Sequence, residues 1–278
     1  MDEICKKNKA EMKILIPMGG KSSRFFDRGY KVNKALLGIT SRHDGQKYPM
    51  ALSALKDIPW IKSKLNQLIC VNSDEHSENG LEKKILKEFP RAIFIHDHVK
   101  LDQAFGCFLA RTHLDTDEDL FIGACDNGFE IDLKDFNNLK KKNDLIVFTH
   151  TNNENIKRNP LAHSWLSLKG QTRSVKSLSF KKPISKDMQH DHATTGMFWF
   201  KNANTFLKFL ENMIWAQDSD NGKYYIDKLV NYYLKKNLNV SILDVKYFCW
   251  GTPLDYEIYE NSINYWMNFS KEHKNFLE

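Results

Sequence analysis

The chain has 278 residues, enough to bury a full hydrophobic core and close to the upper limit at which one domain is the simplest expectation. Its 41% hydrophobic and 12% aromatic content excludes disorder over the whole length, no run approaches the roughly 18 apolar residues of a membrane span, and a charged start favours a cytoplasmic protein. Lysine and arginine exceed aspartate and glutamate by 41 to 35, but this excess of +6 is dispersed, which argues against nucleic acid and suits phosphorylated small substrates.

Short apolar runs alternate with helical patterns through the first 150 residues. The expected strands are 13–18, 68–72, 92–96, 120–124 and 145–149, and the expected helices include 81–89 and 103–112. This alternation predicts an α/β, Rossmann-like fold with a mainly parallel mixed sheet and helices on both faces. Substrates should then bind at the carboxyl ends of the strands.

The second half differs, because its strands follow one another with turns between them. Strands are expected at 165–169, 175–180, 195–200 and 240–245, with helices at 202–215, 224–236 and 254–269 and a polar loop at 151–159. We expect one domain over 1–278, made of an N-terminal extension (1–12), a nucleotide-binding half (13–150), a small β-rich acceptor-binding half (151–260) and a C-terminal helix (254–278).

The segment PMGGKSSRFFDRGYKVNKALL, residues 17–37, has the composition of a phosphate-binding loop. Gly19 and Gly20 follow a buried strand, and glycine lets backbone N–H groups approach phosphate oxygens closely. Arg24 adds a planar fork of donors and Lys34 a compact positive charge. A glycine turn with exposed basic residues is the alternative interpretation.

This segment resembles the signature of the sugar-phosphate nucleotidyltransferases, the family of glucose-1-phosphate thymidylyltransferases and uridylyltransferases. Their GGxGTR-like loop and PKP-like element are here GGKSSR and NKA. Further similarities follow in the same order over residues 13–259, which identifies a divergent member with a GT-A type fold. The resemblance implies that Arg24 and Lys34 hold the triphosphate and that five loop residues bind the nucleotide: Met18, Gly19, Gly20, Ser22 and Ser23.

Two further segments of the first half match the family. LDQAFG, 101–106, is similar to a segment in which a glutamine contacts the pyrimidine base, and Gln103 can offer both a donor and an acceptor. IGACDNGF, 122–129, is similar to an element whose aspartate holds magnesium, which implies that Asp126 binds Mg2+. Read alone, Gln103 suits an ordinary helix start and Asp126 a strand-to-loop turn.

In the second half, VKSLSFKKPISK is similar to the family's EKP segment and TGMFWF to its TGxYxF strand. The match implies that Lys182 neutralises the acceptor phosphate and that Thr195 and Gly196 line the acceptor site. Lys181 replaces an acidic residue that grips the sugar, which would suit an acceptor with extra negative charge.

The closing element YFCWGTPLDYEIY, 247–259, adds Gly251 and Thr252 to the expected acceptor site. Cys249 stands where the family has a second metal-binding aspartate, and a neutral thiol is a poor magnesium ligand. Either Asp126 carries the metal alone, or Asp255 or another carboxylate helps. The five cysteines are scattered and form no CxxC pair, so we expect reduced, mostly buried thiols.

Together these residues predict an Mg2+-dependent nucleotidyltransferase that couples a nucleoside triphosphate to a sugar phosphate, releases pyrophosphate and supplies surface polysaccharide precursors. No general base is needed, because a phosphate monoester with a second pKa of about 6 is already ionised. Two alternatives stay open: a cytidylyltransferase for phosphocholine or a phosphorylated amino acid, and a nucleotide-binding pseudoenzyme. Homo-oligomer formation also stays open, and no membrane or nucleic-acid partner is expected.

Overall fold

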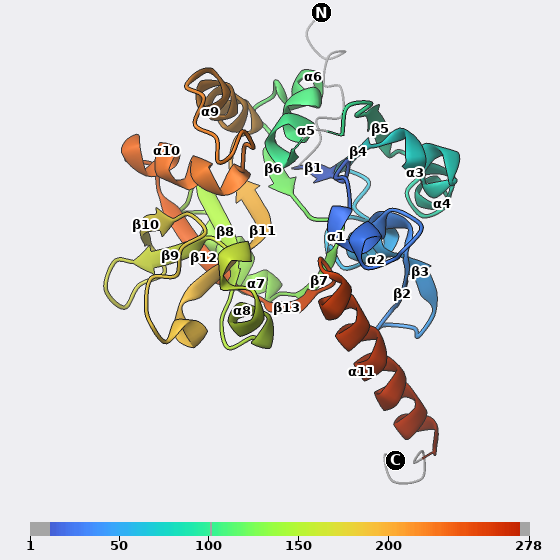
Figure 1. Cartoon of the computed structure of the whole chain (residues 1–278). Helices are drawn as coiled ribbons and strands as arrows, with labels where there is room; N and C mark the ends of the chain where they lie inside the picture. The colour runs from blue at the N-terminus through green and yellow to red at the C-terminus, as the bar shows by residue number, and fades with distance from the viewer. Residues whose placement is uncertain (1–11, 101, 273–278) are drawn as a thin grey trace, which may run out of the picture.

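The computed structural model describes residues 12–100 and 102–272 (Figure 1). The expected N-terminal extension therefore lies almost wholly outside the described residues, as do Leu101, Cys5 and the last residues of the expected C-terminal helix. None of the described helices is both long and apolar enough to cross a membrane.

Four parallel strands form the half of the sheet that comes first in the chain. Their order is β5-β4-β1-β6, and their bounds are β1 (Met12–Pro17), β4 (Gln67–Asn72), β5 (Ile93–His96) and β6 (Asp119–Ile122). Strands covered on both faces need apolar residues at successive positions, and β1 and β4 are buried along nearly their whole length. All four carboxyl ends meet at one edge of the sheet.

The long strand β11 (His192–Phe200) joins the second half to the first. It pairs antiparallel with β6, with β8 (Leu145–His150) and with β9 (Trp165–Leu168), and its register shifts around Gly196, whose φ is +80°. Beyond these lie β10 (Val175–Ser179) on β9 and β12 (Val240–Asp244), parallel to β8. A single nine-stranded sheet therefore extends through both halves.

Helices cover both faces of this sheet, because alternate residues of its strands face opposite cores. Leu15 and Ile122 belong to the core under α5 (Gln103–Leu109), α6 (Arg111–Leu114), α9 (Ala203–Trp215) and α10 (Leu229–Lys235). Ile14 and Phe121 belong to the core under α2 (Met50–Lys56), α4 (Leu81–Glu88) and α7 (Leu133–Lys140). The predicted fold class is confirmed: a mixed sheet with a parallel centre and helices on both faces.

Several elements differ from the expectation. The polar segment 151–159 contains the short helix α8 (Glu154–Arg158), because Asn153 caps its first turn and Ile156 is buried against Trp165. The helix expected from 224 begins as a 3-10 turn, Ile226–Lys228, before α10. A two-stranded ribbon, β7 (Asn127–Glu130) with β13 (Lys246–Cys249), was not expected.

Several short elements lie between β1 and β5 in the chain. They are α1 (Ser23–Asp27), the 3-10 turn Lys34–Leu36, the hairpin β2 (Gly38–Thr40) with β3 (Lys47–Pro49), and α3 (Asp74–Glu78). The C-terminal helix α11 (Pro253–Glu272) starts directly after the β13 strand, and Figure 1 shows its far end projecting from the body of the molecule.

Candidate active site

A cavity of about 720 Å³ lies at the carboxyl edge of the parallel strands. It is large enough for a nucleotide, since small-molecule sites are typically about 300–1,000 Å³. Ten of the residues predicted from sequence line it: Met18, Gly19, Gly20, Ser22, Ser23, Arg24, Lys34, Gln103, Asp126 and Gly251. The segments that carry these residues are far apart in the chain, and the fold brings the residues together around one cavity.

The loop after β1 is held open by glycine. A Cβ on Gly19 would lie 2.7 Å from Oδ2 of Asp97, a contact that no side chain could make without displacing that carboxylate. Gly19 and Gly20 both line the cavity, and glycine lets backbone N–H groups approach a phosphate oxygen closely. Arg24, in the first turn of α1, also lines the cavity and forms no ion pair within the described residues.

Two residues that depart from the family pattern have structural functions in this loop. Ser22 takes the left-handed conformation, with φ of 54°, where the family has glycine, and its Oγ accepts a hydrogen bond from the Lys34 backbone N–H at 3.1 Å. Asn33, in place of proline, is 1% exposed. Its amide donates to the Gly20 carbonyl at 3.0 Å and its Oδ1 accepts from the Ala35 N–H at 3.0 Å.

Asp126 lines the cavity, directly before β7, and the β7–β13 ribbon fixes its position. Its carbonyl accepts the Trp250 N–H at 3.0 Å, and a Cβ on the neighbouring Gly251 would lie 3.0 Å from its Oδ2. The Lys34 ammonium is 2.5 Å from that same oxygen. Burial raises the pKa of the Asp126 carboxyl, but Lys34 and the more distant Arg24 more than offset this and hold it below its ordinary value.

Burial likewise lowers the pKa of Lys34, but the Asp126 carboxylate outweighs that effect and leaves the pKa raised. Both partners are therefore charged at neutral pH. A divalent cation or a phosphate group entering the cavity would meet a preformed pair of opposite charges, of which the carboxylate suits the cation and the ammonium suits the phosphate.

Of the two carboxylates considered as magnesium ligands, Asp126 and Asp255, Asp126 is the better candidate, because the Asp255 oxygens already accept hydrogen bonds from neighbouring side chains. Asp255 is 3% exposed and accepts hydrogen bonds from Asn155 at 2.9 Å, Arg158 at 2.7 Å and Thr252 at 2.6 Å. Burial and the nearby Asp255 raise the pKa of the Cys249 thiol to about 12, so it stays neutral.

Within the described residues no group of three or more His, Cys, Asp or Glu side chains could hold a metal ion. Mg2+ nevertheless commonly uses one or two protein carboxylates and completes its coordination with water and substrate phosphates. The carboxylate of Asp126, in the same cavity as the glycine loop, fits that pattern.

Five predicted acceptor-side residues do not line this cavity: Lys181, Lys182, Thr195, Gly196 and Thr252. The Thr195 hydroxyl donates to the Phe148 carbonyl at 2.9 Å, and the Thr252 hydroxyl donates to Asp255 just before α11. Lys182 is exposed. Their substrate contacts stay predictions.

Lys181 packs on Tyr225, a residue of the cavity wall, and does not line the cavity itself. Its ammonium is 3.6 Å from Oδ2 of Asp220 and 3.8 Å from the centre of the Tyr225 ring, and Tyr225 itself lines the cavity. The expectation that Lys181 brings extra positive charge to the acceptor is thereby weakened, because Asp220 offsets much of that charge.

Comparison with known proteins identifies the fold. No family model and no curated protein sequence matches the chain. The nucleoside-diphosphate-sugar pyrophosphorylase from Vibrio cholerae RC9 superposes with a TM-score of 0.72 at 19% identity, over 89% of this chain and 99% of that one. The inositol-1-phosphate CTP transferase from T. maritima superposes with a TM-score of 0.66 at 15% identity, over 90% and 94%.

A Bacillus anthracis protein proposed as a glucose-1-phosphate thymidylyltransferase, in complex with a sucrose, gives a TM-score of 0.68 at 18% identity, over 91% and 95%. The chain shares its fold with these three proteins. The resemblance drawn from its motifs is therefore confirmed at the level of fold, although the sequence identities are too low to carry substrate or activity with them.

Several residues of the cavity were not predicted from sequence. They are Lys21, Asp97, Lys100, Asp102, Phe105, Lys223 and Tyr225. Lys21 lies inside the glycine-loop motif but was not singled out, and Lys100 directly precedes the segment 101–106, so a short extension of that segment would have found it. Lys223 and Tyr225 belong to a distant segment whose only local signal is the Asn-Gly turn before them.

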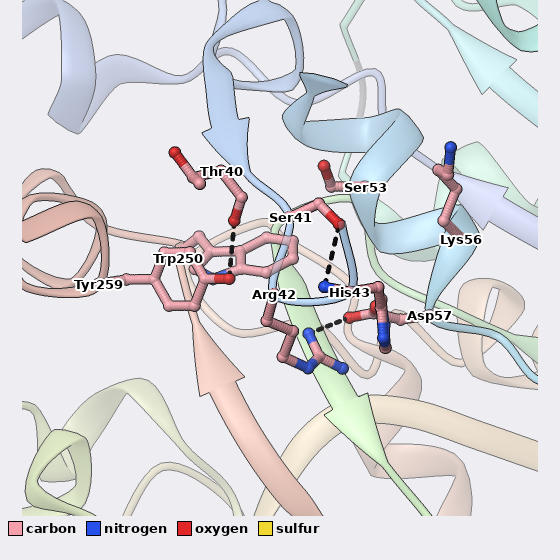
Figure 2. A pocket seen from close by; sticks show the side chains of 9 residues that line it. All are labelled: Thr40, Ser41, Arg42, His43, Ser53, Lys56, Asp57, Trp250 and Tyr259. Carbon is pink, nitrogen blue, oxygen red and sulfur yellow. Dashed lines mark hydrogen bonds and ion pairs between the residues drawn. The ribbon is translucent and has the colours of Figure 1, made fainter. Parts of the chain in front are cut away.

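A second, much smaller cavity of about 10 Å³ is lined by residues that include Arg42, His43 and Asp57 (Figure 2). Its volume corresponds to about one water molecule, so it cannot hold a substrate. Figure 2 shows Arg42 and His43 reaching Asp57, whose carboxylate oxygens lie 2.7 Å and 2.9 Å from them. Asp57 also accepts the Phe129 N–H at 3.3 Å, which fixes the β7 strand that follows Asp126.

Proposed function

We propose that this protein is a nucleotidyltransferase that joins a nucleoside triphosphate to a small phosphorylated acceptor and releases pyrophosphate. The observation that carries the proposal is the placement of Arg24, Lys34, Asp126 and Gln103 around one cavity at the carboxyl edge of the sheet. Cations beside a glycine loop suit a triphosphate, and the Gln103 amide suits the edge of a base.

The chemistry requires positioning more than proton transfer. An acceptor phosphate oxygen attacks the α-phosphorus of the triphosphate, a new P–O bond forms, and the bond to the bridging oxygen breaks as pyrophosphate leaves with its electron pair. Arg24 and Lys34 would hold the phosphates in line and balance the charge on the leaving group. Mg2+, held by Asp126, would supply further charge neutralisation when bound.

For the acceptor we propose a sugar phosphate, with a role in surface polysaccharide precursor synthesis. The pairing of Lys181 with Asp220 supports an acceptor without unusual negative charge. A cytidylyltransferase for a non-sugar phosphate is the second candidate, supported by the structural likeness to an inositol-1-phosphate CTP transferase. The pseudoenzyme alternative rests on four departures from the family pattern: Ser22, Asn33, Ala35 and Cys249. Two of them argue less strongly for lost activity, because Ser22 and Asn33 each form hydrogen bonds that hold the loop.

The test is pyrophosphate release from a panel of UTP, dTTP, CTP and GTP with glucose-1-phosphate and phosphocholine, with Mg2+ and with EDTA. With the productive pair, Arg24→Gln should lower kcat/KM by about 100-fold or more, as loss of one preorganised charge-stabilising donor does. Arg28→Gln is the matched control, since Arg28 ends the same helix but its side chain is 63% exposed and pairs with Glu257 outside the cavity.

Arg28→Gln should stay within about twofold of the wild type, because exposed ion pairs contribute little. Pyrophosphate release from no pair in the panel, or equal turnover by Arg24→Gln and the wild type, would refute the proposed function.

A further inference from the structure

One wall of the cavity is a tight hairpin from the acceptor half. The backbone N–H groups of Asp220 and Lys223 each donate to the other residue's carbonyl, at 2.8 Å and 2.9 Å. Between them, Asn221 and Gly222 have φ of 49° and 72°, the pattern of a two-residue type I′ turn. This turn presents Gly222 and Lys223 to the cavity, and Tyr225 follows. Lys223 forms no ion pair within the described residues, which leaves its ammonium for a substrate phosphate.

Asp102 connects this hairpin to the first turn of α5. Its Oδ1 accepts the Phe105 N–H at 3.0 Å and so caps the helix, while its Oδ2 accepts the Tyr224 N–H at 2.8 Å. The Phe105 and Tyr224 rings also meet edge to face, with centroids 5.2 Å apart. Because a carboxylate has two acceptor oxygens, one side chain joins the nucleotide half to the acceptor half.

The hairpin is also held on its far side. Lys181, directly after the β10 region, pairs with Asp220 and covers the Tyr225 ring. Lys228 donates to the Asp218 carboxylate at 2.7 Å and to the Ser219 carbonyl at 3.1 Å. The hairpin is thus anchored within its own half, and Asp102 is its hydrogen-bonded link to α5, the helix whose first residue is Gln103.

We propose that Asp102 is a positioning residue that couples the binding of the two substrates, an inference that rests on the proposed function. A base held by Gln103 fixes the first turn of α5, Asp102 transmits that position to Tyr224, and Lys223 and Tyr225 are thereby set for the acceptor. Coupling between two ligands is reciprocal, so the acceptor must strengthen nucleotide binding by the same factor.

Two variants separate the two hydrogen bonds of Asp102. In Asp102→Ser the hydroxyl can still cap α5 but is too short to reach Tyr224. In Asp102→Asn the amide has one acceptor oxygen, so one of the two N–H groups loses its partner. The matched control is Asp132→Ser, because Asp132 caps α7 in the same way, through Lys134 and Asp135, and lies outside the cavity.

The readout is the affinity of the productive acceptor from the panel, measured with and without the α,β-methylene analogue of the productive triphosphate. In the wild type the analogue should strengthen acceptor binding, and Asp102→Ser and Asp102→Asn should reduce that strengthening by about tenfold. In the Asp102 variants, any change in the affinity for either ligand alone should be smaller than the loss of coupling, and every value for Asp132→Ser should match the wild type. A wild-type degree of coupling in both variants, or an equal loss of affinity for each ligand alone, would overturn the inference.

Hydrogen exchange separates this inference from the proposed function. Analogues of UTP, dTTP, CTP and GTP should slow exchange of the Tyr224 amide in the wild type but not in Asp102→Ser. If that difference appears while no acceptor yields pyrophosphate, the proposed function fails and the link stands. If pyrophosphate is released but Tyr224 is protected equally in both proteins, the link fails and the function stands.

Discussion

Replacing Asn33 by proline, the residue that the family has at this position, should destabilise the protein. The backbone of Asn33, with φ of −56°, already suits proline, so the change requires no adjustment of that angle, although the Glu75 carboxylate must move away from the proline ring. The loss comes from three hydrogen bonds: two made by the buried side chain, to Gly20 and Ala35, and one from the backbone N–H to the Glu75 carboxylate at 2.8 Å.

The magnitude follows from these bonds. Each neutral bond contributes about 1 kcal/mol and the bond to Glu75 about 2 kcal/mol, because its acceptor is charged. Proline offsets up to about 1 kcal/mol of this loss, because it reduces the conformational entropy of the unfolded chain. The free energy of unfolding of Asn33→Pro should therefore fall by about 3 kcal/mol, and that of Asn33→Ala, which keeps the backbone N–H, by about 2 kcal/mol.

Urea denaturation at neutral pH, followed by far-UV circular dichroism and by tryptophan fluorescence, measures both values and tests whether unfolding is two-state. The order wild type, Asn33→Ala, Asn33→Pro is the decisive result. A proline variant as stable as the wild type would show that these bonds do not hold the loop. A proline variant more stable than Asn33→Ala would show that the bond to Glu75 contributes less than the entropic stabilisation by proline.

Two other perturbations test the loop and the core. Ser22→Gly should leave the free energy of unfolding nearly unchanged, because relief of the left-handed conformation and loss of the bond to Lys34 are each about 1 kcal/mol, whereas Ser22→Ala should lose about 1 kcal/mol. Equal urea midpoints for the two variants would contradict this. Burial lowers the pKa of His150 to about 3 and of His76 to about 4, so both stay neutral in the folded protein while the unfolded chain takes up protons below pH about 6.5. Stability should therefore fall between pH 7 and 5, by about 2 kcal/mol for each histidine. His150→Gln should make the fall shallower, and an unchanged pH dependence of the unfolding free energy would refute its assignment to burial.

Local patterns predicted the parts of the fold and site that depend on neighbouring residues. The apolar runs gave the parallel strands, and the residue types of the glycine loop gave Gly19, Arg24 and Lys34 as cavity residues. Asp126 and Gln103 were found because family order placed them after a strand and at a helix start, where an α/β sheet presents polar groups.

Contacts between distant segments were not predictable in this way. The pairing of β7 with β13 depends on residues more than a hundred positions apart, yet it sets the position of Asp126 beside Gly251. Lys181 was expected to add positive charge to the acceptor site, because its neighbours in the sequence do not indicate that it forms an ion pair with Asp220. Asp102 directly precedes the helix expected at 103–112, a position where aspartate commonly caps a helix, but its second hydrogen bond, to Tyr224, becomes visible only in three dimensions.

The single sheet that extends through both halves determines how substrates can enter and leave. Opening the halves as two rigid bodies would break the hydrogen bonds between β11 and β6, so hinge bending about a linker is unfavourable. Any movement that helps ligands to enter or leave the cavity would then be local motion of short segments at the rim, which proceeds faster than domain rotation. Turnover would in that case be limited by the rim segments that contact the product, and a variant far from the reacting atoms could change the rate of release without altering the chemical step.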